Sequence, residues 1–193
     1  DMRGSEPVVV EPKGDMSRRP KAALYVRVPW AMVLGSEIPS FVLYDDGTVI
    51  RTEPEPARLV EGKLDGDAAA FLTSLASLLT SEPARDSVVR ATDQPTVSIL
   101  LETSRGWILR SVYGLSGDGT VTSASAQDGQ PSASFLAALR TMRSAPLAEA
   151  APYAPERIEI MLWGYEHSPE TPAPWAPKIP APLRPPPSQR RLL

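Results

Sequence analysis

Apolar and polar side chains alternate along several short stretches of the chain, which is the period of a β-strand with one buried face. The stretch ALYVRVP, residues 23–29, is the first of them. One side of this strand would carry Leu24, Val26 and Val28, and the other side would carry Tyr25 and Arg27. The stretch FVLYDDGTVI, residues 41–50, places two β-forming runs around Asp46-Gly47, a residue pair that accepts the backbone angles of a tight hairpin turn. We therefore predict a strand followed by a β-hairpin.

The same alternation recurs further along the chain. Residues Thr96–Leu115 place two β-rich runs around the turn Ser104–Gly106, which predicts a second hairpin. Residues Arg157–Glu166 (RIEIMLWGYE) alternate again and predict a late strand. The N-terminal stretch Pro7–Pro12 (PVVVEP) is typical of a short edge strand, because the proline at each end cannot extend a hydrogen-bonded ladder.

Two other stretches have apolar residues at helical spacing. Gly66–Thr80 carries one continuous apolar stripe, and Asp67 stands at its start, where a carboxylate can accept from free amide groups. Pro131–Arg143 carries a second stripe. We predict that both stripes face a sheet and form the core through Phe71, Leu75, Leu78, Phe135, Leu139 and Met142.

The order of these elements predicts an α+β fold. We expect a mostly antiparallel sheet of about five to seven strands with both amphipathic helices on one face. The other face would then be solvated, covered by the chain's own arms, or used for binding. Changes in composition divide the chain into an N-terminal arm (1–21), a compact α+β domain (22–166) and a proline-rich C-terminal tail (167–193).

Composition excludes several classes of function. The net charge of −3 with interspersed signs argues against a nucleic-acid binder, which needs a basic face. No apolar run is long enough for a transmembrane helix. The chain has no cysteine, which removes disulfides and thiolate sites, and its excess of arginine over lysine is typical of a high-GC bacterial genome. A soluble bacterial protein is predicted, either cytoplasmic or exported with a leader removed before Asp1.

Candidate catalytic and metal-binding motifs have simpler interpretations. Asp45–Gly47 resembles part of a metal loop, but no further carboxylates follow at the required spacing, so we interpret it as a turn. The glycines of Tyr113–Thr120 lack the Gly-Lys-Ser/Thr of a phosphate loop, so we expect a plain loop. His167 is the only histidine and stands in a polar tail without a nucleophile motif. We predict no catalytic residue, no metal and no cofactor.

The C-terminal tail is the most distinctive segment. Nine prolines stand between Pro169 and Pro187, and proline favours the extended polyproline II helix, whose backbone is open to partners. A plain solvated linker seldom carries large apolar side chains, so we expect this tail to dock on its own domain or on another protein. The predicted binding residues are Trp163, Tyr165, Trp175, Ile179, Leu183 and Arg184.

These observations predict a non-enzymatic interaction protein. Its proline- and tryptophan-rich arms and an exposed sheet face would contact another protein: a subunit of an assembly, a toxin neutralised by an immunity-like protein, or a protease held by an inhibitor-like one. The alternative from another class is a hydrolase with a carboxylate-based site between the sheet and the arms, which would need buried acidic residues in a deep pocket.

Overall fold

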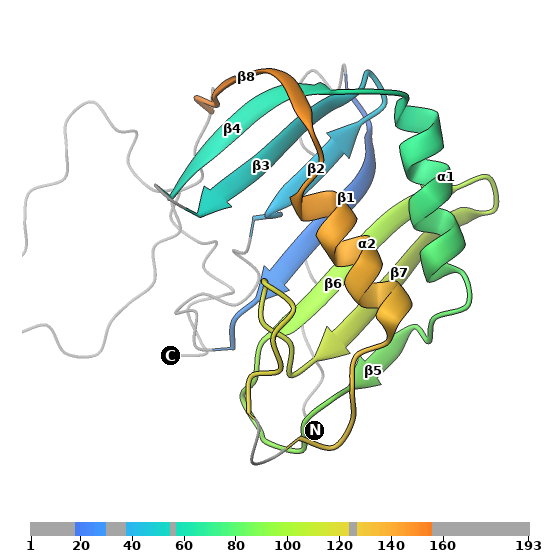
Figure 1. Ribbon diagram of the computed structural model, residues 1–193, viewed down its shortest axis with the longest axis vertical. Coiled ribbons are helices and arrows are strands. Elements are labelled where there is room, and N and C mark those ends of the chain that lie inside the picture. The colour runs from blue at the N-terminus through green and yellow to red at the C-terminus, as the bar shows by residue number, and fades with distance from the viewer. Residues whose placement is uncertain (1–17, 30–37, 55–56, 124–126, 156–193) are drawn as a thin grey trace, which may run out of the picture. The chain divides into compact units, whose positions relative to one another are not determined.

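The computed structural model describes residues 18–29, 38–54, 57–123 and 127–155. Within these ranges the chain forms an eight-stranded sheet and two α-helices, arranged as an α+β fold (Figure 1). The strands are β1 (Pro20–Arg27), β2 (Phe41–Tyr44), β3 (Thr48–Pro54), β4 (Ala57–Leu64), β5 (Arg85–Ser87), β6 (Thr96–Thr103), β7 (Gly106–Tyr113) and β8 (Leu147–Pro152). The helices are α1 (Ala68–Leu79) and α2 (Ala133–Arg143).

The spatial order of the strands is β5-β7-β6-β1-β2-β3-β4-β8. Every neighbouring pair is antiparallel except β5 and β7, which are parallel. The first strand, β1, lies between β2 and β6, so it joins the meander β2-β3-β4 to the hairpin β6-β7. The predicted mostly antiparallel sheet is confirmed.

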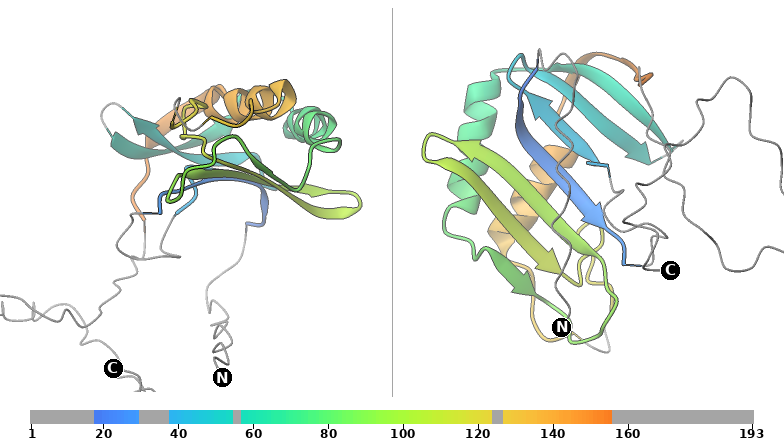
Figure 2. Two further views of the ribbon diagram at one scale, coloured as in Figure 1. Left: turned by 90° about the horizontal axis from the view of Figure 1, so that it is seen from below. Right: turned by 180° about the vertical axis from the view of Figure 1, so that it is seen from behind.

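Both helices lie on one face of the sheet, as predicted (Figure 2, left). Asp67 caps α1, and its side chain accepts a hydrogen bond from the amide of Ala69 at 2.9 Å. Ser132 caps α2 in the same way, with its hydroxyl 3.0 Å from the amide nitrogen of Phe135. The helix stripes point toward the sheet because only that side removes their apolar surface from water.

The hydrophobic core lies between the helices and the sheet. Leu75, Phe135, Leu139 and Met142 are at most 1 % exposed, which confirms their predicted burial. Phe71 and Leu78 pack against this cluster while remaining half-buried. The sheet contributes the residues that point to the same face, namely Ala22, Leu24, Phe41, Leu43, Val49, Val97, Ile99, Leu101 and Val112.

The alternation pattern does not predict three of the eight strands, β4, β5 and β8. β5 consists of exposed polar residues, and its strand geometry comes from pairing with Ser111–Tyr113 of β7. β8 is rich in alanine and is paired with β4. A side chain at Gly62 of β4 would lie 2.9 Å from the carbonyl oxygen of Ala148, so this close strand approach needs a glycine.

Several predictions fall outside the described residues. They concern the strands predicted at Pro7–Pro12 and Arg157–Glu166, the proline-rich tail 167–193, and the arm except its last residues. β1 begins at Pro20, within the range assigned to the arm.

Candidate functional site: the second face of the sheet

The sheet has a second face, opposite α1 and α2, on which no helix or strand of the described ranges packs (Figure 2, right). Side chains reach this face from every other position of β1, β6 and β7, because successive residues of a strand point to opposite sides. Its large exposed residues are Trp107 and Leu109 of β7, which are 50 % and 45 % exposed. We call this surface the second face.

A concavity of about 620 Å³ lies on the second face. Its lining residues come from four neighbouring strands of the sheet: Tyr25, Arg27, Arg85, Asp86, Thr96, Ser98, Leu109, Ser111 and Tyr113. The lining therefore combines hydroxyl groups, one aliphatic side chain, two arginines and one acidic residue, Asp86.

Hydrogen bonds fix the floor of this concavity. The Tyr113 hydroxyl donates to the carbonyl oxygen of Ala91 at 2.8 Å and accepts from the amide of Gln94 at 3.1 Å. The hydroxyls of Ser98 and Ser111 lie 2.9 Å apart across β6 and β7. These contacts hold the polar groups in place before any ligand arrives, which lowers the entropy lost on binding.

Arg85 differs from the other charged residues near the concavity. Its side chain is exposed, and no hydrogen bond or ion pair joins its guanidinium to any residue of the described ranges. A guanidinium group offers several donors in a planar fork that matches a carboxylate or a phosphate. The concavity therefore presents an uncommitted positive group beside the apolar side chain of Leu109.

A further concavity of about 480 Å³ lies on the helix-covered side, near the C-terminal end of α2. Its cations are already engaged with the backbone. Arg51 donates to the carbonyl oxygen of Ala145 at 2.6 Å, and Arg143 donates to the carbonyl oxygen of Gly117. We interpret these contacts as structural, since they join β3 and the loop after β7 to the end of α2.

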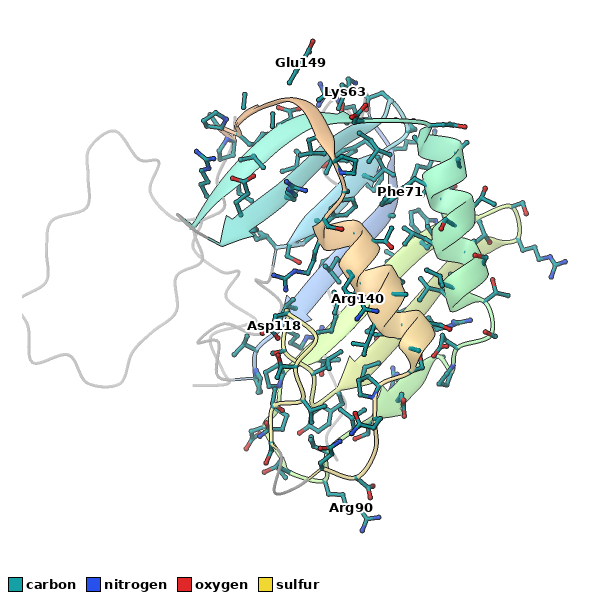
Figure 3. The ribbon with its side chains drawn as sticks, viewed as in Figure 1. Lys63, Phe71, Arg90, Asp118, Arg140 and Glu149 are labelled. Carbon is teal, nitrogen blue, oxygen red and sulfur yellow. The ribbon has the colours of Figure 1, made fainter. Side chains whose placement is uncertain are left out.

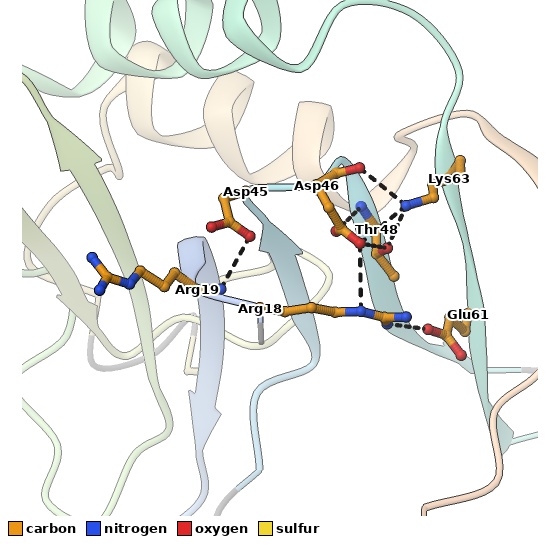
Figure 4. A network of polar contacts seen from close by, with 7 residues as sticks. All are labelled: Arg18, Arg19, Asp45, Asp46, Thr48, Glu61 and Lys63. Atoms are coloured by element: carbon orange, nitrogen blue, oxygen red, sulfur yellow. Dashed lines mark hydrogen bonds and ion pairs between the residues drawn. The ribbon is translucent and has the colours of Figure 1, made fainter. Parts of the chain in front are cut away.

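The turn at Asp45–Gly47 closes the hairpin β2-β3, as predicted. The amide of Gly47 donates to the carbonyl oxygen of Tyr44 at 3.1 Å, and Gly47 has a φ of 78°. The Asp46 carboxylate accepts from the amide and the hydroxyl of Thr48, both at 2.9 Å, and from Lys63 at 3.1 Å (Figure 4). The Asp46 carboxylate is therefore bound by its own hairpin and by the neighbouring strand β4.

The same carboxylate has a lowered pKa. Burial is the largest single influence and favours the neutral form, but the hydrogen bonds from Thr48 and Lys63 together outweigh it and lower the pKa of Asp46 to about 2. Arg18 adds an ion pair to Asp46 at 3.4 Å and another to Glu61 at 2.7 Å. These interactions make Asp46 a structural anion.

The loop after β7 uses its carboxylate in a similar manner. Asp118 accepts from the Ser116 hydroxyl and from the amide of Thr120 at 2.9 Å. The hydrogen bonds from Ser116 and Thr120 lower the pKa of Asp118 to about 2. This turn satisfies its own polar groups, in agreement with the interpretation of Tyr113–Thr120 as a plain loop.

Acidic residues form no candidate catalytic pair in the part of the chain that the structure describes. No carboxylate there is buried, and the carboxyl groups with shifted pKa values, Asp46, Glu53 and Asp118, all have them lowered. A general acid needs the opposite shift. The described ranges also hold no group of three or more residues placed to bind a metal ion. The hydrolase interpretation therefore gains no support from these residues.

The predicted binding residues, Trp163, Tyr165, Trp175, Ile179, Leu183 and Arg184, all lie outside the described residues. The structure instead places Leu109 and Arg85 at one concavity, and Trp107 lies on the same face of β7 as Leu109. Neither alternation nor composition selects these three residues. The stretch GWILR carries apolar residues at three successive positions, Trp107, Ile108 and Leu109. Successive residues of a strand point to opposite faces, so at least one of these three apolar side chains must point away from the core. This is the one sequence signal that could have identified the surface.

No protein-family model, no curated protein and no solved structure matches this chain. Within the described residues, neither helix is long and apolar enough to cross a membrane.

Proposed function

We propose that this protein is a non-enzymatic interaction module that binds another protein through the second face of its sheet. The observation that carries the proposal is the pair Trp107 and Leu109, two large apolar side chains about half exposed on a face with no described cover. Interfaces are enriched in aromatic side chains at their centre and in polar groups at their rim. Trp107 and Leu109 match the centre, and the hydroxyl-lined concavity beside Leu109 matches the rim.

The extent of this surface supports a protein partner. The concavity takes its lining residues from four neighbouring strands, so a partner could contact a broad part of the sheet. Its polar floor is held by hydrogen bonds within the sheet, so a partner would meet a preorganised surface.

A test compares variants on the two faces of the sheet. Trp107→Ser should abolish recovery of a partner from the native host, because an interface loses most affinity when its aromatic anchor is removed. Arg140→Glu is the matched control, since Arg140 is an exposed residue of α2 on the helix-covered side (Figure 3). Quantitative mass spectrometry after affinity purification would compare the wild type with both variants. Recovery of the same proteins by the wild type and by Trp107→Ser would contradict the proposal.

The arms are a separate part of the proposal. We expect the C-terminal tail to add contacts to the same partner, with Trp175 as an anchor, since tryptophan combines a large apolar surface with one hydrogen-bond donor. Truncation after Glu166 should then leave the melting temperature unchanged and weaken the complex. A large drop in melting temperature would mean that the tail serves the stability of the chain.

A further inference from the structure

The outer edge of β7 has a stretch without a neighbour in the described chain. β5 pairs with Ser111–Tyr113 alone, so residues Gly106–Arg110 have no strand on their outer side. At about 3.3 Å per residue, this free edge is about 16 Å long. An unpaired strand edge is a template for an additional strand.

The backbone groups that point outward can be assigned from the contacts of β5. The amide of Ser111 donates outward to the carbonyl oxygen of Ala84 at 3.1 Å, and the carbonyl oxygen of Tyr113 accepts from Val88 at 3.0 Å. Alternate residues of a strand direct their backbone groups to the same side. Trp107 and Leu109 therefore also direct their N–H and C=O groups outward.

One of these outward groups already has a partner. The guanidinium of Arg110 donates to the carbonyl oxygen of Leu109 at 2.9 Å, and it also binds the carbonyl oxygens of Leu79 at 3.0 Å and Thr80 at 3.4 Å. Arg110 thereby joins the C-terminal end of α1 to β7. Within the described ranges, the N–H groups of Trp107 and Leu109 and the C=O group of Trp107 have no hydrogen-bond partner, so an added strand could pair with them.

The charges around this edge select the kind of partner. Arg105 lies in the turn at one end of the free stretch, and Arg85 lies at the other end, where β5 begins. Both are exposed, and neither guanidinium forms a hydrogen bond or an ion pair with another residue in the described ranges. Two uncommitted cations therefore flank the apolar pair Trp107 and Leu109. A carboxylate at each end of an incoming strand would complement them.

The same charges argue against pairing of this edge with a second copy of the chain. In an antiparallel pair centred on Ile108, Trp107 of one copy would lie opposite Leu109 of the other. Arg105 of each copy would then lie beside Ser111 of the other, and Ser111 is the residue paired with Arg85. Like charges would meet at both ends of the interface, which opposes association.

We infer that the free edge of β7 binds an extended acidic segment of a partner protein as an added β-strand. The N–H groups of Trp107 and Leu109 and the C=O group of Trp107 form the ladder. The apolar pair receives alternate side chains of the segment, and Arg85 and Arg105 receive its terminal carboxylates. This inference rests on the proposed function and assigns the partner's chemistry.

The probe is a library of random linear peptides of about twelve residues, long enough to span the free edge, selected against the full chain. We expect enriched peptides to alternate apolar and polar residues between acidic ends. The double variant Arg85→Glu/Arg105→Glu should bind such a peptide about tenfold more weakly than the wild type, whereas Arg140→Glu should bind it with unchanged affinity. Methylation of the central peptide nitrogens should also weaken it about tenfold, because that change blocks the ladder and keeps the side chains.

Amide hydrogen exchange on the free and bound full chain locates the contact. In the free protein the amides of Ile108 and Arg110, which face β6, should exchange slowly, and those of Trp107 and Leu109 should exchange fast. Binding of the peptide should slow the exchange of the Trp107 and Leu109 amides. If these two amides are already protected in the free protein, the edge is occupied and the inference is wrong.

Other outcomes separate this inference from the proposed function. A selected peptide could protect no edge amide from exchange and lose its affinity for the Ser98→Arg variant. Such a peptide binds the concavity, so the inference would fail and the proposed function would stand. If the chain associates with itself and Leu109→Lys abolishes this association, the edge binds a second copy. That result would overturn the inference of an acidic partner segment. No enrichment of any peptide, together with partner recovery unchanged by Trp107→Ser, would overturn both.

Discussion

On β7, Val112 is 3 % exposed on the helix-covered face, whereas Trp107 and Leu109 on the second face are 50 % and 45 % exposed. All three are large apolar residues of one strand, so their chemistry does not explain the difference. The covered face excludes water because α1 and α2 pack on it, and burial of apolar surface there stabilises the fold. The comparison shows that position in the sheet, and not side-chain type, decides which apolar residues of β7 are buried.

The largest expected effect comes from truncating matched leucines on the two faces. Leu75→Ala should lower the free energy of unfolding by roughly 2–5 kcal/mol, because it leaves a cavity in the core. Leu109→Ala should change it by less than about 0.5 kcal/mol, as exposed substitutions do. Urea denaturation monitored by circular dichroism measures both. Equal shifts of the two midpoints would mean that the second face is as buried as the first.

Two glycines extend the comparison from side chains to the backbone. Gly114 has a φ of 83°, and a side chain there would lie 2.2 Å from a methyl group of Val89 in the core. Gly47 has a φ of 78° and nothing within 4 Å of the same position. Both alanine variants incur the left-handed backbone penalty of about 1–2 kcal/mol, and Gly114→Ala adds an overpacking cost of about 1–3 kcal/mol.

Thermal unfolding of the two alanine variants tests this difference. Gly114→Ala should melt at a clearly lower temperature than Gly47→Ala. Gly47→Val should be less stable than Gly47→Ala, because a β-branched residue resists positive φ most strongly. If the two alanine variants melt together, the loop after β7 does not pack on Val89 as described.

The charged hairpin β2-β3 makes a smaller, pH-dependent contribution. The pKa of Asp46 is about 2 in the folded chain, below its ordinary value of 3.8, so the stabilisation is complete above about pH 4 and is lost as the pH falls toward 2. Asp46→Asn removes it at every pH. The free energy of unfolding of the wild type should exceed that of Asp46→Asn by no more than about 1 kcal/mol near pH 6. The effect is small because the Asp46 side chain is 38 % exposed and screened by solvent.

Chemical denaturation at a series of pH values measures this effect. The advantage of the wild type over Asp46→Asn should shrink between pH 4 and pH 2. An advantage that grows as the pH falls would contradict the assigned sign.

The smallest effect is expected at the neighbouring carboxylate. Asp45 accepts one hydrogen bond from the amide of Arg19 at 3.1 Å, and the amide oxygen of asparagine can accept the same bond. Asp45→Asn should therefore change the free energy of unfolding by less than about 0.5 kcal/mol. A loss of metal affinity or of activity in this variant, at an unchanged melting temperature, would identify Asp45–Gly47 as a site instead of a turn.

Local sequence signals predict much of the covered face correctly. The stripe with Leu75 and Leu79 predicts α1, Asp67 predicts its cap, and Asp46-Gly47 predicts a hairpin turn. These signals succeed because each depends on residues close together in the chain: helical spacing, a capping acceptor and a positive φ. The candidate site depends on strands far apart in the sequence, and no local pattern brings Tyr25, Arg85 and Ser111 to one concavity.

The sequence by itself determined which segments are helices, where the hairpins β2-β3 and β6-β7 turn and which helix residues enter the core, since these properties follow from local periodicity and backbone preference. Only the tertiary structure decided that β5 and β8 are strands, because their hydrogen bonds come from β7 and β4. It also decided which side of β7 meets the helices. Trp107, Ile108 and Leu109 are apolar on both sides of that strand, so alternation alone cannot choose the side that stays exposed.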